Sequence, residues 1–263
     1  MDQRVTPLRP PLKWAGGKRW LIPTLAKIWK KHDHRRLVEP FCGGLSVALG
    51  LQPDTALLND VNRALINFYQ QIQSGLEIDL PLHNEEAIYY QYRTDFNELN
   101  MKDESPEMTA QLFYYLNRTG YNGLCRFNKS GGYNVPFGRY KTINYQQDFS
   151  ELQCVLASWD FNNKDFLEMD VKPGDFIYAD PPYDVPFRQY SQQGFDWDDQ
   201  VRLAEWLSQH DGPVVLSNQA TPRIRTLYKD LGFKLRILDA PRRISCKGDK
   251  RQDVKEVLAL RGV

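Results

Sequence analysis

Four consecutive residues, Asp180-Pro181-Pro182-Tyr183, combine a carboxylate, a stiff turn and an aromatic ring. Proline has a fixed φ and no N–H group, so the Asp180 carboxylate and the Pro181 carbonyl remain as free acceptors beside a flat ring. An exocyclic amine on a planar base would satisfy all three groups. Taken alone, these residues are better explained as a turn that ends a strand, because Asp-Pro and Pro-Pro are ordinary loop signals.

The segment before this tetrapeptide predicts where the tetrapeptide lies in the fold. Residues 175–179 form a short apolar run after the breaker pair Pro173-Gly174, a pattern that predicts a buried strand. The tetrapeptide would then lie at the carboxyl end of a strand, which is the edge where open α/β sheets bind ligands.

The composition is that of a soluble globular protein. The chain has 263 residues, of which 41% are hydrophobic and 25% charged, and this length fits one α/β domain with an insert. A net charge of +1 neither favours nor excludes nucleic acid, so any basic face must be local. No apolar run approaches the roughly 20 residues of a membrane span, and no signal-peptide core is present, so we expect no contact with a membrane.

The cysteines are spread along the chain and favour neither a zinc site nor a disulfide framework. No C-x-x-C pair occurs, which fits a reducing cytosol and a protein without a metal. The four positions are Cys42, Cys125, Cys154 and Cys246.

A glycine-rich loop near the N-terminus is a candidate ligand contact. Gly16-Gly17 would let the backbone approach a ligand closely, Trp14 offers a stacking face, and Lys13 and Lys18 offer charge. The alternative is a glycine-marked turn before a helix that starts near residue 18. The positions that we expect this helix to bury, or to place in its first turn, are Leu21, Pro23, Leu25, Ile28 and Trp29.

A strand, a glycine loop and a helix follow in the order found in nucleotide-binding α/β units. An apolar strand at 37–39 leads into Gly43-Gly44, and residues 46–49 continue as a helix. The next strand, at 56–58, ends near Asp60, whose carboxylate could hold ribose hydroxyls. Asp60 could equally cap the helix that we expect at 61–73.

Residues 77–120 predict two helices that build a small helical core. Their apolar residues recur at helical spacing. The set is Ile88, Tyr89, Tyr92, Phe96 and Leu99 in the first helix, and Met108, Leu112, Phe113 and Leu116 in the second.

Residues 118–147 carry five Lys or Arg and no Asp or Glu, with aromatic residues interleaved. The glycine pair in 130–132 predicts the tip of a β-hairpin. Arginine and asparagine can pair with base edges, and lysine can contact phosphate, so the composition favours nucleic acid. The alternative is a solvated loop with its aromatic residues packed beneath.

The remaining chain returns to an α/β pattern. We expect strands at 159–161, 213–218, 233–238 and 256–260. One helix should begin at 198 or 199 and bury Val201, Leu203, Ala204 and Leu207, and another should be capped by Thr221 with Pro222 in its first position. The loop at 184–196 could lie over the site. The basic segment 242–251 is either a phosphate contact or a solvated loop.

Four segments, in this order, resemble the Dam-type DNA N6-adenine methyltransferases (D12 class, α-group). They are residues 12–18, 38–44, 117–140 and 180–183, and the third is the most specific. The resemblance implies a Rossmann-like S-adenosylmethionine-dependent methyltransferase sheet with an inserted target-recognition domain, helical and ending in a β-hairpin. Residues 1–62 and 147–263 would form the catalytic and cofactor domain. Residues 63–146 would form the insert, with its hairpin at about 121–140.

The resemblance also implies residue roles at the reaction centre. Asp180, Pro181, Pro182 and Tyr183 would be catalytic and hold the target adenine. S-adenosylmethionine would be the cofactor, leaving as S-adenosylhomocysteine, with no metal. Residues 39–43 would line its methionine side and 165–166 its adenine. The full cofactor-binding set is Trp14, Ala15, Gly16, Lys18, Glu39, Pro40, Phe41, Gly43, Asp60, Asp165, Phe166 and Asp180.

Relatives with this hairpin commonly methylate adenine in GATC, so the expected partner is double-stranded DNA. Arg126 would read a guanine, Lys13 the first guanine, and Leu124 with Pro136 the thymine. Tyr121 and Asn122 would fill the space that the adenine leaves. The full DNA-binding set is Lys13, Arg93, Arg118, Tyr121, Asn122, Leu124, Arg126, Asn134, Pro136 and Arg139, with Arg93 and Arg139 on the backbone. We expect a monomer in the bacterial cytosol or nucleoid, encoded by host or phage, either solitary or paired with a restriction enzyme.

Two features depart from the family pattern, and other activities remain open. Leu45 stands where relatives usually carry Gly or Ala, and segment 184–195 is shorter than expected. Methylation of cytosine N4, of an RNA adenine or of a protein glutamine amide would use the same pocket, but those families usually begin the tetrapeptide with Ser or Asn. A catalytically inactive DNA-binding relative is a further alternative, which the intact glycine loop, Asp60 and Asp180 argue against.

Overall fold

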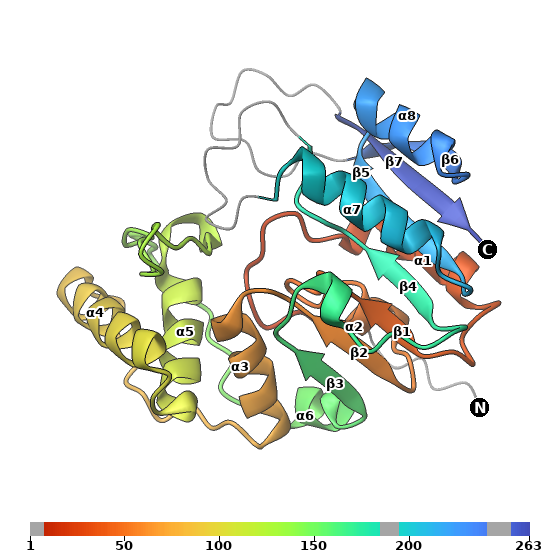
Figure 1. Ribbon diagram of the computed structural model, residues 1–263. Helices are drawn as coiled ribbons and strands as arrows, with labels where there is room; N and C mark the ends of the chain where they lie inside the picture. The colour runs from red at the N-terminus through yellow and green to blue at the C-terminus, as the bar shows by residue number, and fades with distance from the viewer. Residues whose placement is uncertain (1–7, 185–194, 241–253) are drawn as a thin grey trace.

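A computed structural model describes residues 8–184, 195–240 and 254–263 of the chain (Figure 1). In these ranges one sheet of seven strands has the order β3-β2-β1-β4-β5-β7-β6. All neighbours from β3 to β5 are parallel, whereas β7 is antiparallel to both β5 and β6. The strands are β1 Leu37–Glu39, β2 Ala56–Asn59, β3 Trp159–Asn162, β4 Phe176–Ala179, β5 Val214–Gln219, β6 Lys234–Ala240 and β7 Val254–Arg261. This confirms the predicted Rossmann-like α/β sheet.

The strand order reverses between β1 and β4. The chain builds β1, β2 and β3 outward on one side, and then adds β4 on the other side of β1. At such a switch point the loops leaving the two central strands diverge and open a crevice at their carboxyl ends. The loops that leave these two strands are the glycine loop at 40–44 and the tetrapeptide at 180–183, so the topology brings the two predicted motifs together.

Helices cover both faces of the sheet because successive strand residues point to opposite sides. Phe176 and Tyr178 of β4 face one core, while Ile177 and Ala179 face the other. The first core is covered by α1 Ile22–Trp29, α2 Ala48–Leu51, α3 Arg63–Gln73 and α6 Ser150–Leu156, and the second by α7 Trp197–Ser208 and α8 Pro222–Asp230. In Figure 1, α7 crosses in front of β4, on the side away from α1.

Most helices lie where the sequence predicts them. Helix α1 follows a short 3-10 helix, Arg19–Leu21, has Pro23 in its first turn, and buries the expected apolar set. Thr221 caps α8 with its side chain, and Pro222 is its first residue, as predicted. In α7 the residues Leu203, Ala204 and Leu207 are buried, but Val201 is only half-buried.

The predicted cap of α3 is wrong. The helix begins at Arg63, not at Val61, and the Asn62 side chain accepts the N–H of Leu65. Asn and Asp cap helices about equally well, so the sequence does not distinguish Asn62 from Asp60. The Asp60 carboxylate accepts the N–H of Asn62 before the helix begins, and the N–H of Gly43 in the loop after β1.

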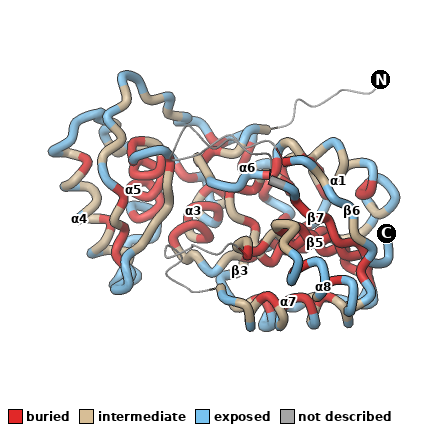
Figure 2. The backbone as a smooth tube through the Cα atoms, turned by 90° about the horizontal axis from the view of Figure 1, so that it is seen from above, coloured by how far each residue is buried: buried red, intermediate tan, exposed pale blue. Residues whose placement is uncertain are grey.

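Two helices of the predicted insert follow: α5 Pro106–Thr119 packs against α3, and α4 Glu86–Lys102 packs against α5. Figure 2 shows α5 as largely buried, with α4 outside it. Tyr89 and Phe96 are fully buried, whereas Met108 is exposed, contrary to prediction, because helical spacing does not reveal which turns a neighbouring helix covers. The core is continuous from the sheet into these helices, and the domain boundaries remain a prediction.

The segment after α5 forms an irregular hairpin that begins with a 3-10 helix, Tyr121–Gly123. Two isolated antiparallel bridges, Gly120 to Phe137 and Phe127 to Tyr133, hold it together. Its tip lies at the predicted glycines, and the Asn128 side chain accepts the N–H groups of Ser130 and Gly132. Tyr133 is 2% exposed and packs edge-on against Phe96, so the aromatic residues do pack beneath the turn.

Residues 185–194 and 241–253 lie outside the described part of the chain. They include most of the loop predicted at 184–196 and all of the basic segment 242–251. Among the described helices none is both long and apolar enough to cross a bilayer.

Candidate active site

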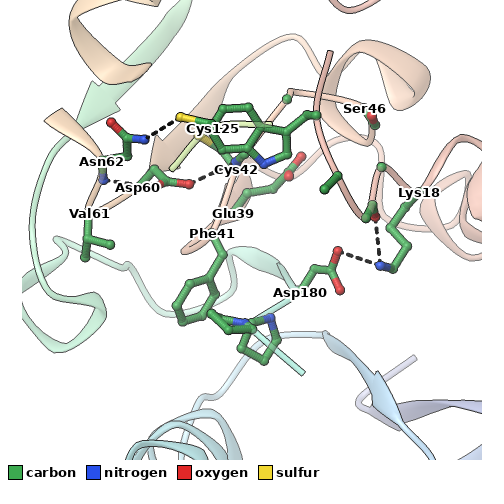
Figure 3. Close-up of a pocket in the computed structure, with 18 of the residues that line it drawn as sticks. Lys18, Glu39, Phe41, Cys42, Ser46, Asp60, Val61, Asn62, Cys125 and Asp180 are labelled. Carbon is green, nitrogen blue, oxygen red and sulfur yellow. Dashed lines mark hydrogen bonds and ion pairs between the residues drawn. The ribbon is translucent and has the colours of Figure 1, made fainter. Parts of the chain in front are cut away.

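A cavity of about 560 Å³ lies at the carboxyl ends of β1 and β4, between the sheet and the hairpin (Figure 3). Residues from several parts of the chain line it. They are Trp14 to Lys18, Glu39 with Phe41 to Gly44 and Ser46 to Val47, Asp60 to Ala64, Asn100 with Cys125 to Phe127 and Gly131, and Tyr178 with Asp180 to Tyr183.

Most of the predicted reaction-centre residues meet at this cavity. The whole tetrapeptide lines it, as do nine of the cofactor residues: Trp14, Ala15, Gly16, Lys18, Glu39, Phe41, Gly43, Asp60 and Asp180. Pro40, Asp165 and Phe166 are not among its lining residues, and Arg126 is the one predicted DNA residue that is. The role of each residue remains a prediction.

The glycines after β1 make room for Trp14. A Cβ on Gly43 would lie 2.7 Å from Trp14 Nε1, and a Cβ on Gly44 would lie 2.7 Å from Trp14 Cβ. Gly43 also has φ +44°, which disfavours other residues. Leu45 adopts φ +58° although it is not glycine, and it is fully buried, so its packing offsets the strain.

Asp60 joins the ends of β1 and β2. Its Oδ2 accepts the N–H of Gly43 at 3.1 Å, and its Oδ1 accepts the N–H of Asn62 at 2.9 Å. Burial raises the pKa of this carboxyl to about 6, although these two hydrogen bonds lower it. The Asn62 amide in turn donates to Cys125 Sγ at 3.4 Å, so the same loop contacts the hairpin.

Glu39 is a buried carboxylate, one oxygen of which has no hydrogen-bond partner among the described residues. It is 2% exposed and lines the cavity, and no described residue bonds its Oε1. Burial raises the pKa of Glu39 well above its ordinary value, and the nearby Asp180 raises it further. A buried acceptor without a partner costs free energy until a donor reaches it. The position therefore fits the ammonium group of a ligand.

Asp180 is held on both carboxylate oxygens. Tyr178 lies opposite Val215 in the β4–β5 register, so Asp180 falls beside Ser217. The Ser217 hydroxyl donates to Asp180 Oδ1 at 2.8 Å, and Lys18 Nζ lies 2.9 Å from Oδ2. A carboxylate offers about four acceptor positions, so roughly two remain open to a further donor. In the view of Figure 3, Glu39 lies between Asp180 and Asp60.

The turn after Asp180 is fixed from the opposite face of the sheet. Gln200 Nε2 donates to the Pro182 carbonyl at 2.7 Å, and Asn218 Nδ2 donates to Gln200 Oε1 at 2.9 Å. No hydrogen bond among the described residues ends on the Pro181 carbonyl. The tetrapeptide therefore presents two acceptors, the carboxylate and this carbonyl, on a braced turn.

Aromatic rings pack around Phe41, which lines the cavity. Phe41 packs 5.9 Å from Phe166 and, edge-on, 5.5 Å from Phe195. Phe166 thus lies behind Phe41. Asp165 caps the 3-10 helix Phe166–Glu168 and forms an ion pair with Arg202 at 2.9 Å.

Lys13 connects the N-terminal loop that carries Trp14 to the predicted insert. The Asn117 side chain pairs with both its backbone N–H and its carbonyl, each at 2.8 Å. Lys13 Nζ donates to the Arg118 carbonyl at 2.9 Å and lies 4.0 Å above the Tyr140 ring. Burial, and then Arg118, lower the Lys13 pKa. The residue before Trp14 is therefore clamped to α5.

Apart from Lys13, which lies in the N-terminal loop, the predicted DNA residues lie on α4, α5 and the hairpin. Arg126 donates from Nε to Asn134 Oδ1 at 2.7 Å, and from Nη2 to the Asn134 carbonyl at 3.1 Å, so its guanidinium is held in one orientation. Three other arginines are hydrogen-bonded within the chain: Arg93 donates to the Val135 carbonyl, Arg118 to the Asn144 carbonyl and Arg139 to Glu86. Leu124 is half-buried, whereas Tyr121 and Pro136 are exposed. Asn122 has φ +53°. Contact with DNA remains a prediction for each.

Sequence reasoning missed several residues that shape the site. Ser217, Gln200 and Cys125 reach it only through strand register and tertiary packing. Val61 and Asn62 follow the acid that ends β2, so the same rule that found Asp60 could have included them. In the described ranges, no cluster of three or more His, Cys, Asp or Glu could hold a metal ion.

The chain is similar to known DNA methyltransferases over most of its length. A profile of the D12 class N6 adenine-specific DNA methyltransferase family matches residues 14–244. The retron Ec67 DNA adenine methylase of Escherichia coli is 36% identical, covering 95% of this chain and 90% of its own length. The DNA adenine methylase of E. coli K12 is 35% identical over 95% and 94% of the two chains. The type II methyltransferase M1.LlaDCHI of Lactococcus lactis is 34% identical, with the same coverage.

Proposed function

This chain belongs to the D12 class of N6 adenine-specific DNA methyltransferases, and we propose that it methylates N6 of a flipped adenine within GATC in duplex DNA. One observation carries the proposal. A braced Asp180-Pro181-Pro182-Tyr183 turn shares a cavity with the buried Glu39, whose Oε1 has no donor among the described residues. The first element suits a planar base with an exocyclic amine, and the second suits the cationic end of a methyl donor.

The residues present fit S-adenosylmethionine. Glu39 would take its ammonium group, and Asp60 its ribose hydroxyls. Trp14 in the N-terminal loop would line the methionine side of the cofactor, and Phe41 would line its adenine side. When bound, this cofactor supplies an electrophilic methyl group on its sulfonium.

The target adenine must leave the duplex, because N6 is not reachable inside the stack. Flipping costs a few kcal/mol, and stacking on an aromatic ring returns roughly 1–3 kcal/mol per base. The ring for this stacking is Tyr183, which lines the cavity next to Asp180.

The tetrapeptide would act by positioning and electrostatics. The N6 lone pair is conjugated into the base and is a poor nucleophile. Hydrogen bonds from N6 to the Asp180 carboxylate and the Pro181 carbonyl would localise this lone pair and aim it at the methyl group. No side chain needs to form a covalent bond, and the proton can leave after transfer.

Two observations support GATC as the target. Residues 117–140 resemble the recognition segment of relatives that methylate this sequence. The Arg126 fork is held by Asn134 in one orientation, which suits bidentate pairing with a guanine.

A transfer assay tests the proposed reaction. The purified chain is incubated with radiolabelled S-adenosylmethionine and duplex DNA that lacks methylation, and the DNA is digested to nucleosides. We expect label in N6-methyldeoxyadenosine only, and more on a GATC duplex than on one with the site scrambled. Label in N4-methylcytosine, or none in DNA, would contradict the proposed reaction, and equal label on both duplexes would contradict the target sequence.

A further inference from the structure

The antiparallel strand β7 brings a distant residue to the catalytic edge of the sheet. Because β7 runs against its neighbours, its first residues lie where the parallel strands end. Glu256 pairs in register with Gln219, the last residue of β5. A residue 73 positions after Tyr183 is thereby placed beside the tetrapeptide.

Glu256 also points to the same face of the sheet as the catalytic groups. Leu258 and Leu260 of β7 belong to the core that holds Tyr178, and side chains alternate along a strand, so Glu256 shares their face. The Tyr183 hydroxyl donates to Glu256 Oε2 at 2.8 Å. Glu256 is only 9% exposed, so this hydrogen bond is shielded from water.

We propose that Glu256 is a positioning residue for methyl transfer, which holds the Tyr183 ring in the plane on which the flipped adenine stacks. This inference rests on the proposed function. Rotation about the Cβ–Cγ bond of tyrosine has broad minima, so the ring needs an external restraint. Two restraints are present: the carboxylate on the hydroxyl, and Lys18 Nζ at 4.6 Å from the ring centroid.

Packing alone does not account for a glutamate here. The next four residues of β7, 257–260, are all apolar and buried, and an apolar residue would continue that pattern without burying a carboxylate. Burial raises the pKa of Glu256, while Lys18 and the Tyr183 hydroxyl oppose that shift. The groups that compensate for burying this charge are thus the ones that surround the target-base site.

A double-mutant cycle separates positioning from a general effect on the sheet. Single-turnover methyl transfer is measured for the full chain and for the variants E256L, Y183F, E256L/Y183F and E256Q, with S-adenosylmethionine binding and thermal melting as checks. The matched control is D239N, because Asp239 is an exposed carboxylate on the adjoining β6, paired with Lys255. The wild-type rate on GATC DNA reports on the proposed function independently of the variants.

We expect E256L and Y183F each to slow transfer by roughly tenfold or more, since both remove one hydrogen bond to a carboxylate. The double variant should be no slower than either single one, and D239N should match the wild type. E256Q should recover most of the rate, because the amide oxygen still accepts from the tyrosine. The affinity for S-adenosylmethionine should stay unchanged in all of them.

Three results would overturn the proposal: a wild-type rate in Y183F, additive losses in the double variant, or E256Q as slow as E256L. Y183F removes one oxygen and leaves β7 intact, so it decides the question even if E256L fails to fold. If the wild type itself does not methylate DNA, the proposed function fails, and this inference fails with it.

Discussion

At the scale of single residues, the site divides two jobs between two carboxylates. Asp180 is braced on both oxygens and would face the target base, whereas Glu39 has an oxygen without a partner among the described residues and would face the cofactor. The two differ because Ser217 and Lys18 reach Asp180. The sequence identifies both carboxylates, since each lies at or beside the end of an apolar strand, but it does not reveal these partners, which depend on register and on the packing of the N-terminal loop.

The variant Asp180→Asn tests the catalytic carboxylate. The amide is isosteric and still accepts from Ser217, but it presents an NH₂ group where the carboxylate offers only acceptors. We expect transfer to fall by at least about 100-fold, because preorganised hydrogen bonds at the reacting atom have effects of this size. DNA and cofactor binding should largely persist.

The control for this variant is Asp211→Asn. Asp211 is exposed and lies three residues before β5, at the end of the sheet opposite to the tetrapeptide. The control variant should retain the wild-type rate. Transfer by Asp180→Asn within a few-fold of wild type would remove Asp180 from the catalytic role.

Asp60 makes cofactor affinity depend on pH. Its pKa in the free protein is raised from 3.8 to about 6, so the folded chain binds more protons than the unfolded one between these values, and ionising Asp60 costs stability as the pH rises through this window. The ionised form is the one that would accept the two ribose hydroxyls of the cofactor. Affinity for S-adenosylmethionine should therefore strengthen from about pH 5 to about pH 7.

Isothermal titration at several pH values measures this dependence. Asp60→Asn should bind S-adenosylmethionine more weakly than the wild type and lack the pH dependence that Asp60 causes. Any pH dependence caused by Glu39 should be the same in the wild type and in the variant. An identical pH profile in the two proteins would show that Asp60 does not hold the cofactor.

At the scale of elements, the glycine loop and the N-terminal loop fit together through Trp14. A Cβ on Gly44 would lie 2.7 Å from Trp14 Cβ, so Gly44→Ala must displace the indole or the loop. We expect cofactor affinity to fall roughly tenfold, since overpacking of this kind costs about 1–3 kcal/mol. In a Trp14→Gly background, which removes the Cβ that the new methyl group would meet, the same substitution should have little further effect. Additive losses in binding titrations would mean that Trp14 is not the group that the glycine accommodates.

Element positions were largely predictable from local patterns, and element ends were not. Apolar runs located β1, β2, β4 and β5, and helical spacing located α1 and α5, because burial leaves a periodic record in the sequence. Asn62, and not Asp60, caps α3, and the sequence does not distinguish the two because both are good capping residues and lie close together. The hairpin tip lies at the predicted glycines, but its arms form only isolated bridges, because Tyr133 and Phe127 pack into the helical core instead of extending a ladder.

At the scale of the whole molecule, the insert and the catalytic sheet share one core and one cavity. Asn117 clamps Lys13, which precedes Trp14, and Cys125 contacts Asn62, which follows Asp60 and Val61. The predicted insert therefore touches both loops that would hold the cofactor, through α5 and through the hairpin. The sequence indicated the two halves separately, but contacts between residues about 60 to 100 positions apart leave no local pattern.

Sequencing of methylated bases in DNA from cells that express this chain tests the central claim most directly, because it reports the modified base and its site together. Cells without methylases of their own receive either the wild type or Arg126→Ala. The account predicts N6-methyladenine at GATC with the wild type. With Arg126→Ala it predicts the same modified base at a relaxed set of sites, since one bidentate pair contributes about 1–3 kcal/mol of discrimination. Methylated cytosine, adenine methylation without a site preference in the wild type, or the same sites in both strains would contradict it.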